Sequence, residues 1–555
     1  MKNLKLFSLL MALVITLSVF TSCLNLFPST DTEQTEDSYE DTVSESATET
    51  ESETESEKAT ESEKDTEESE DSTDTEKTDT EAETESAPES ESVSESEKDS
   101  EPESESESEE EAIRYLNGVD ITEYAIVYGV NDVDYSYRAA KYIRDQIKAL
   151  TGVKLPINKD TAEAHAHEIV VGETSRDISA TLDADTEGLQ FALYADDTHI
   201  AMEGDYFIIA AAAYFFIDTY VTEDNLYAQV PCEVKIHEPI VKEAKNFMLL
   251  IGDGMGPNQT KLFEAFDAAT EGNKAYSDGE DFFYGYLLPY QGWSITTSLS
   301  GTTDSAAGGT ALATGYKTYN SRIGRDMNGD DIQSLTELAG SLGMGSAVVS
   351  TDSVTGATPS AFSAHANSRN DTDVIKESQA ALKLKYGTLI NCGDPAYTKT
   401  GIMSLESRIA SVLNDLSYDE DGFFLMYEEA TIDKKSHSSD LEGTFDSLVR
   451  FNQAIGIFME YAFYHPDTFV LITADHETGG LKINEETGEF YYTSITNSEG
   501  TRNHTGINVP IFAYGMGAEI FNGATVENVE IPKQIANLMG VEEFGGPLHA
   551  YDYFT

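Results

Sequence analysis

The sequence has few positively charged residues and few cysteines. It contains 34 Lys and Arg residues against 102 Asp and Glu residues, which gives a formal net charge of -68. Because nucleic-acid-binding proteins meet phosphates with basic patches, this shortage argues against nucleic-acid binding. The three cysteines are Cys23, Cys232 and Cys392, and the last two fall in different predicted domains. We therefore expect no structural disulfide.

The first 23 residues have the pattern of a bacterial export signal. Lys2 and Lys5 precede an apolar run over residues 6–20, and Thr21-Ser22-Cys23 resembles a lipobox, although Phe20 is less usual there than leucine. The alternative, a transmembrane anchor, is disfavoured because the run is short and no stop-transfer segment follows. We expect a secreted protein, held on the extracytoplasmic side of the bacterial cell membrane through an acylated Cys23.

Residues 24–111 form a segment rich in Ser, Thr, Glu and Asp. Within it, residues 31–111 contain 37 acidic residues against 4 lysines. Such a composition buries too little apolar surface to offset the entropy of ordering, so we expect a disordered linker extended by self-repulsion. Its favoured role is a tether that holds the globular part away from a membrane. Gathering divalent cations is a weaker alternative, because solvated carboxylates bind them weakly.

The remaining chain is too long for one core, so we expect two domains. In residues 112–240, short apolar runs at 124–128 and 168–172 surround a helical pattern at 137–150, which indicates a small α/β domain. The pattern AAKYIRDQIKALTGVKLPI…EIVVGETSR resembles the small N-terminal α/β domain of some glycoside hydrolases. We find no catalytic constellation there, and predict a non-catalytic domain.

Residues 241–555 alternate continuous apolar runs with clusters of polar residues. The runs are typical of buried parallel strands, and we predict strands at 246–251, 346–350, 423–427, 469–473 and 509–515. Carboxylates and imidazoles follow several of these runs, where open α/β sheets keep their ligand sites. Carboxylate and imidazole donors suit Zn²⁺. We predict a site for two metal ions, formed by Asp253, Asp433, His437, Asp475, His476 and His504.

Two further residues have the chemistry to handle a phosphoryl group. Ser305 precedes a run of small residues typical of a tightly packed helix, with Thr303 or Asp304 at its start. A serine there lies beside free backbone N–H groups, although a close-packed helix start without chemistry is an equal alternative. From Pro359 a helix is predicted to run to Arg369, whose planar fork can clasp phosphate oxygens. A solvated surface arginine is the alternative.

Over residues 245–555 the chain resembles the alkaline phosphatase family. The motifs that carry the resemblance are Ile251-Gly-Asp-Gly-Met-Gly256, Thr303-Asp-Ser-Ala306, Ala357-Thr-Pro359 with Arg369, Glu428 through His437, Thr473-Ala-Asp-His476 and His504-Thr-Gly506. The resemblance implies a three-layer α/β sandwich with a largely parallel central sheet. It also implies hydrolysis of phosphate monoesters to inorganic phosphate through a phosphoserine, with two Zn²⁺ ions and one Mg²⁺ ion.

The resemblance also implies individual roles. Asp433, His437 and His504 hold the first zinc, and Asp475 and His476 hold the second. Asp253 bridges the second zinc and a magnesium site completed by Thr358 and Glu428. Ser305 is the nucleophile and contacts the second zinc, Arg369 clamps phosphate, Asp304 orients that arginine, and Lys434 reaches phosphate through water.

The chain departs from the family at Gly356, where familiar members carry Asp or His near the third metal. The identity of the third metal and the oligomeric state, with a homodimer as one option, stay open. Phosphodiesterases and phosphonate hydrolases of the same superfamily are alternatives, whereas sulfatases are disfavoured because no Cys-x-Pro-x-Arg sequence occurs. A cell-surface glycan-binding protein with an idle phosphatase core is an alternative from a different class.

Overall fold

The computed structural model describes residues 115–129, 133–182, 186–221, 229–269, 282–393, 405–497 and 500–546. The predicted signal peptide at 1–23, the acylated Cys23 and the predicted linker at 24–111 lie outside the described residues and stay predictions. Among the described residues, no helix combines the length and apolar character needed to cross a membrane.

A six-stranded sheet with its helices follows the predicted linker. Its strand order is β4-β3-β5-β7-β6-β8, with parallel pairing from β4 to β7 and antiparallel pairing of β6 with both neighbours. The strands are β3 (Tyr124–Tyr128), β4 (Ile157–Lys159), β5 (His167–Val171), β6 (Phe191–Ala195), β7 (His199–Glu203) and β8 (Lys235–His237). The helices are α2 (Val133–Thr151), α3 (Ser179–Leu182) and α4 (Ile208–Tyr220). The predicted α/β layer is therefore present in this segment.

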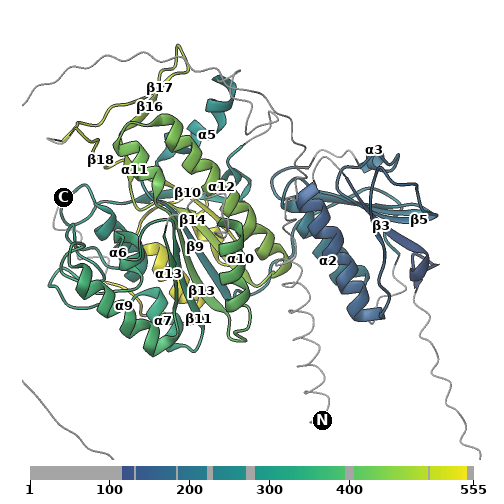
Figure 1. Ribbon diagram of the computed structural model, residues 1–555, viewed down its shortest axis with the longest axis horizontal. Helices are drawn as coiled ribbons and strands as arrows, with labels where there is room; N and C mark the ends of the chain where they lie inside the picture. Colours follow the sequence, from purple (N-terminus) through teal and green to yellow (C-terminus); the bar gives the residue numbers. More distant parts are fainter. Residues whose placement is uncertain are drawn as a thin grey trace, which may run out of the picture. The chain divides into compact units, whose positions relative to one another are not determined.

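An eight-stranded sheet forms the centre of the later segment (Figure 1). Its order is β12-β11-β13-β9-β14-β19-β10-β20, and the first five strands are parallel neighbours. β19 is antiparallel to both of its neighbours. The strands are β9 (Asn246–Gly252), β10 (Tyr290–Ile295), β11 (Gly345–Ser350), β12 (Leu389–Cys392), β13 (Phe423–Glu429), β14 (Thr468–Thr473), β19 (Val509–Tyr514) and β20 (Thr525–Glu527). The predicted largely parallel central sheet is confirmed.

Helices cover both faces of this sheet (Figure 1). In β9, Met248 and Leu250 pack in one core with residues of α12, whereas Leu249 and Ile251 pack in a second core with residues of α6, α7 and α13. A strand buried on both faces needs a continuous apolar run, which explains the sequence pattern. The helices are α5 (Pro257–Ala269), α6 (Ser305–Thr314), α7 (Leu335–Ser341), α9 (Thr372–Tyr386), α10 (Leu405–Leu416), α12 (Leu441–Tyr464) and α13 (Glu530–Leu538).

One predicted element is wrong in extent. The predicted helix over 359–369 is replaced by the short α8 (Ala357–Ala361), after which the chain turns. The carbonyl of Phe362 accepts hydrogen bonds from hydroxyls at the start of α7, and Ala366 then pairs with Ile323 in a backbone bridge. These tertiary hydrogen bonds outweigh the modest local preference for helix.

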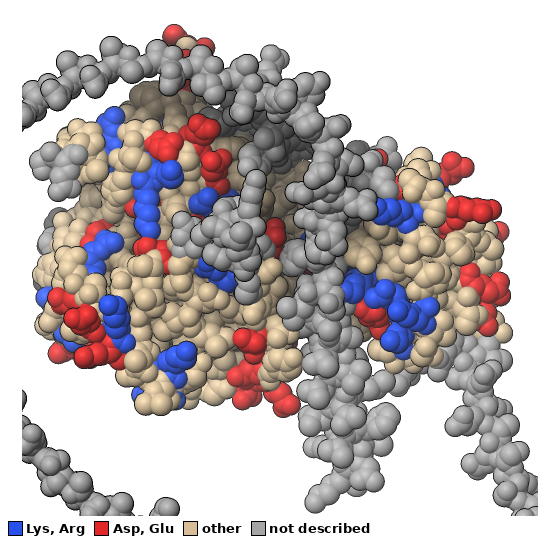
Figure 2. Space-filling model, in the orientation of Figure 1, with Lys and Arg blue, Asp and Glu red and all other residues tan. Residues whose placement is uncertain are grey.

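The remaining elements are short. They are β1 (Tyr115–Leu116), β2 (Val119–Asp120), α11 (Thr431–His437), β15 (Glu477–Thr478), β16 (Leu481–Ile483), β17 (Phe490–Tyr492), β18 (His504–Thr505) and the 3-10 turns Ile121–Glu123, Tyr284–Leu287 and Ala518–Phe521. On the face drawn in Figure 2, Lys and Arg side chains are interspersed with Asp and Glu side chains.

Candidate metal centre and nucleophile

The predicted metal ligands lie at one edge of the eight-stranded sheet. Because β13, β9 and β14 are parallel neighbours, their carboxyl ends reach the same edge. Asp253 follows β9, and Asp475 with His476 follows β14. Gly254 turns the chain with a φ of +76°, and a Cβ there would lie 2.9 Å from the Cα of Asp433. A glycine is therefore needed for the end of β9 to approach the segment of Asp433 this closely.

Two other elements complete the cluster. α11 begins directly after β13, and its helical spacing places Asp433 and His437 on one face, as the sequence predicted. β18 pairs with β15 in an antiparallel register that sets His504 opposite Thr478. This pairing brings a histidine from a distant part of the chain to the strand ends.

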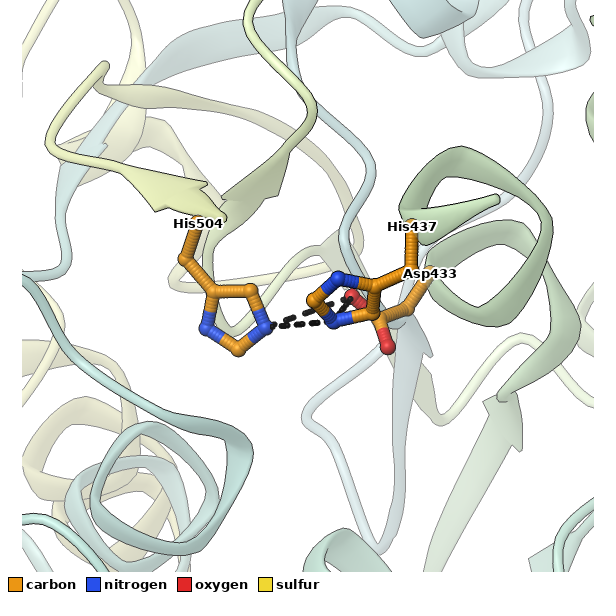
Figure 3. A group of neighbouring side chains, drawn as sticks. All are labelled: Asp433, His437 and His504. Carbon is orange, nitrogen blue, oxygen red and sulfur yellow. Dashed lines mark hydrogen bonds and ion pairs between the residues drawn. The ribbon is translucent and has the colours of Figure 1, made fainter. Parts of the chain in front are cut away.

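Asp433, His437 and His504 form the first group (Figure 3). The Nε2 atoms of the two histidines lie 3.0 Å apart. Oδ1 of Asp433 lies 3.3 Å from Nε2 of His437 and 3.5 Å from Nε2 of His504. Three potential ligand atoms from three side chains thus point at one another.

The hydrogen bonds behind the two imidazoles show which nitrogen is free to bind a metal. Nδ1 of His437 contacts the carbonyl of Arg502, and Nδ1 of His504 lies 2.9 Å from the carbonyl of Thr303. A carbonyl only accepts, so each Nδ1 carries the proton and donates it. In the neutral imidazole, Nε2 is then a lone-pair donor. Metal-bound histidines commonly show this arrangement.

Asp253, Asp433 and His476 form a second group, so Asp433 belongs to both. Nε2 of the fully buried His476 lies 3.5 Å from Oδ1 of Asp253 and 3.3 Å from Oδ2 of Asp475. Among the described residues, neither of these buried carboxylate oxygens has a hydrogen-bond partner. Buried carboxylate oxygens without donors are costly, and a cation would satisfy them.

The carboxyl groups of the cluster shift each other's ionisation. Burial and the nearby charges of Asp475, Asp433 and Glu428 raise the pKa of Asp253 well above its usual range. Burial, with a smaller effect of Asp433, raises the pKa of Asp475 to about 6, and burial raises that of Glu428 to about 8. Burial would also raise the pKa of Asp433, but hydrogen bonds that His437 and His504 donate in their protonated forms hold it well below its usual range. So many buried carboxylates fit a site built for cations.

Ser305 is the first residue of α6, and its Oγ lies 3.2 Å from Nε2 of His476. The side chain is almost fully buried. Asp304 caps the helix by accepting a hydrogen bond from the backbone N–H of Ala307 at 3.0 Å. Gly308 lets the helix approach β14's end, because a Cβ there would lie 2.9 Å from the carbonyl oxygen of Asp475. The nucleophile predicted from the sequence therefore lies beside the second group and at a helix N-terminus.

The side chain of Arg369 faces Asp304. Its Nη1 is 3.6 Å from Oδ2 of Asp304, and its side chain is 36% exposed. The backbone N–H of Arg369 donates to the carbonyl of Ser321 at 2.7 Å, which fixes the start of the side chain. Asp304 thus faces both α6 and the predicted phosphate clamp.

Of the residues predicted for a third ion together with Asp253, Glu428 lies near the end of β13 and Thr358 lies in α8. Glu428 and Thr358 are both buried, and Ser350 donates a hydrogen bond to Glu428. Lys434 forms an ion pair of 2.6 Å with Asp352. The sequence prediction missed Asp352, although it follows the strand β11 in the same way that Asp253 follows β9.

A family model described as Alkaline phosphatase matches residues 244–391 and 396–503. "Alkaline phosphatase 4" from Bacillus subtilis is 29% identical over 297 residues, which are 43% of this chain and 63% of that relative. The chain thus spans less than two thirds of that relative's length. Alkaline phosphatase from Escherichia coli is 25% identical over 404 residues, which cover 51% of this chain and 84% of that protein. The solved alkaline phosphatase from the Antarctic bacterium TAB5 is 25% identical and covers 55% of this chain and 100% of its own, with a TM-score of 0.45.

Proposed function

We propose that this protein hydrolyses phosphate monoesters and releases inorganic phosphate, because residues 244–391 and 396–503 match the model of the alkaline phosphatase family. The observation that carries the proposal is the position of Ser305. Its hydroxyl lies at the N-terminus of α6, 3.2 Å from His476 and beside two groups of potential metal ligands. A nucleophile beside cations and free helix N–H groups is suited to receive a phosphoryl group.

The proposal includes two Zn²⁺ ions and one Mg²⁺ ion. The first zinc would be held by Asp433, His437 and His504, whose free Nε2 atoms converge with a carboxylate oxygen. The second would be held by Asp475, His476 and Asp253, and the magnesium by Asp253, Thr358 and Glu428. When bound, the ions supply positive charge that favours the Ser305 alkoxide and stabilises the attacking and leaving oxygens.

Ser305 would carry the phosphoryl group between two displacements. In the first, its Oγ loses its proton to solvent and bonds to phosphorus while the ester P–O bond breaks, and the leaving alkoxide takes a proton from water. In the second, a water molecule loses a proton to solvent and its oxygen bonds to phosphorus while the bond to Oγ breaks, and Oγ takes up a proton, which regenerates the serine. Each displacement inverts phosphorus, so the configuration is retained overall. The N–H groups of α6 favour the anionic phosphoryl group.

Arg369 would clasp the non-bridging oxygens of the substrate. Asp304, 3.6 Å away, holds the guanidinium towards the start of α6, where Ser305 lies. A monoester presents one more charged oxygen than a diester, so this clamp favours monoesters. Lys434, next to Asp433 in α11, adds positive charge at the same edge of the sheet.

The direct test compares p-nitrophenyl phosphate with its bis-ester as substrates of the full chain, at alkaline pH with Zn²⁺ and Mg²⁺. We expect faster turnover of the monoester. Equal or faster turnover of the bis-ester would favour the phosphodiesterase alternative instead. No turnover of either ester would favour the glycan-binding alternative.

The role of Ser305 is tested by trapping the phosphoenzyme with radiolabelled phosphate at acidic pH. Ser305→Ala should abolish trapping and lower kcat by about 10³-fold or more. The matched control is Ser341→Ala, which removes an exposed hydroxyl at the end of α7 and should leave both measurements unchanged. Phosphate that is still trapped by Ser305→Ala would show that another residue is the nucleophile.

A further inference from the structure

Gly356 directly precedes α8, the helix that carries Thr358. The family resemblance leads us to expect an Asp or His side chain at this position, beside the third cation. A Cβ built on Gly356 would lie 2.2 Å from Oδ2 of Asp352 and 2.6 Å from its Cγ. The space that a side chain at position 356 would enter is therefore already filled by the carboxyl group of Asp352.

Asp352 is held firmly in this position by its neighbours. Its Oδ1 accepts hydrogen bonds from Nζ of Lys434 at 2.6 Å and from the backbone N–H of Ser353 at 2.7 Å. Its own backbone N–H donates to Oγ of Ser350 at 2.8 Å. Among the hydrogen bonds of the described residues, none is made to Oδ2. One carboxylate oxygen is thus anchored, and the other lies free above Gly356.

The groups around Asp352 are those of the predicted magnesium site. Ser350, which accepts from the backbone of Asp352, donates its own proton to Glu428. Thr358, two residues after Gly356, is 1% exposed, and its hydroxyl lies beside Glu428 and lowers the pKa of that carboxyl, but it makes no hydrogen bond of normal geometry among the described residues. A buried hydroxyl without such a hydrogen bond, close to carboxylates, points to a ligand that is hard and positively charged.

A purely structural ion pair does not explain this arrangement well. The side chain of Lys434 is 49% exposed, and ion pairs at that exposure contribute little stability. The Asp352 carboxyl group also leaves room only for glycine at position 356, two residues before Thr358. A role at the cation accounts for both features.

We propose that Asp352 supplies, from the loop after β11, the carboxylate beside the third cation that Gly356 lacks, and that Lys434 holds it there. The cation has the chemistry of Mg²⁺, which prefers oxygen donors. This inference rests on the proposed function for the existence of the third cation. It assigns the carboxylate to a different position of the chain from the one that the resemblance indicates.

The test measures Mg²⁺ binding to the zinc-loaded full chain by calorimetry, together with the bound zinc content. Asp352→Asn should weaken Mg²⁺ binding by about 10-fold or more while the zinc content stays the same. Asp352→Gly should weaken it similarly, and the double variant Asp352→Gly/Gly356→Asp should regain most of the affinity, because it moves the carboxylate back to position 356. The matched control, Asp373→Asn, removes a carboxylate that is 95% exposed and should change nothing.

Unchanged Mg²⁺ affinity in Asp352→Asn would overturn the inference. It would also be overturned if the double variant bound Mg²⁺ no more tightly than Asp352→Gly while both had the same melting temperature. The melting temperature of each variant shows whether it is folded. If the wild-type protein cleaves monoesters and Asp352→Asn binds Mg²⁺ as tightly as the wild type, the inference is overturned and the proposed function is not. Protein that binds Mg²⁺ through Asp352 but cleaves no ester would overturn the proposed function alone.

Discussion

Asp304 shows how one side chain can serve both structure and chemistry. One oxygen accepts from Ala307 and caps α6, and the other accepts from the backbone of Ser321 at 2.9 Å and faces Arg369. The cap fixes the helix start at Ser305, and the charge holds the arginine. Because the two roles use different oxygens, substitutions at position 304 can separate them.

Asp304→Asn keeps an oxygen for the cap but removes the charge that faces Arg369. We expect inorganic phosphate to inhibit this variant about five- to tenfold less strongly, because the exposed guanidinium loses its anchor. The inhibition constant of phosphate checks the prediction. Asp304→Ala, the comparison variant, also loses the cap and should lower the free energy of unfolding by about a further 1 kcal/mol. Equal phosphate inhibition of wild type and Asp304→Asn would contradict the orienting role.

At the scale of elements, the start of α7 is linked to the segment that carries Arg369. Ser334 and Glu337 form a capping box, and Glu337 also lies 3.2 Å from Nε2 of His365. Nδ1 of His365 donates to the carbonyl of Gly324 at 2.8 Å. This link replaces the helix that the sequence predicted here, and it places the chain between α8 and Arg369 on a fixed path.

The link should contribute stability that depends on pH. Burial would lower the pKa of His365, but the hydrogen bond that it donates to Glu337 raises it on balance above 6.5. Burial would raise the pKa of Glu337, but His365 lowers it on balance below 4.5. Because folding raises the pKa of His365, this histidine stabilises the fold below its unfolded pKa, and the effect is lost as pH rises through its folded pKa. Because folding lowers the pKa of Glu337, this carboxyl group stabilises the fold above its unfolded pKa, and the effect is lost as pH falls through its folded pKa.

Glu337→Gln tests this link, because glutamine keeps the capping box but not the charge. We expect the variant to lose about 0.5–1 kcal/mol more stability at about pH 6 than at about pH 9. Denaturant unfolding of both proteins at each pH measures the difference. A loss of stability that is the same at both pH values would show that the ion pair contributes nothing.

At the scale of the whole molecule, the described parts of residues 113–555 belong to one compact unit. Helices α2 and α4, beside the six-stranded sheet, pack against α12 of the later segment. Nε of Arg138 donates to both oxygens of Glu460 at 2.8 and 3.0 Å, and the rings of Tyr142 and Tyr464 stack with centroids 4.4 Å apart. The predicted division at residue 240 thus separates two sheets that share a packed interface.

Arg138→Ala should destabilise the protein by about 1–3 kcal/mol, because it leaves the mostly buried Glu460 without its partner. Thermal unfolding measures the loss, and kcat/KM for p-nitrophenyl phosphate should stay unchanged because Arg138 lies outside the candidate site. The matched control is Arg144→Ala on the same helix, whose partner is the adjacent Asp145. If Arg144→Ala lowered the stability as much as Arg138→Ala, the ion pair between Arg138 and Glu460 would not be a special source of stability.

The sequence by itself determined the central strands and singled out Ser305 and the potential metal ligands as candidates. Strands buried on both faces require unbroken apolar runs, and Asp and His residues that follow these runs lie at the edge where parallel strands end. Only the tertiary structure decided that the chain turns after Ala361, that Asp433 belongs to both ligand groups and that Asp352 fills the space at Gly356. These features depend on hydrogen bonds and close approaches between segments far apart in the sequence, which local patterns do not encode.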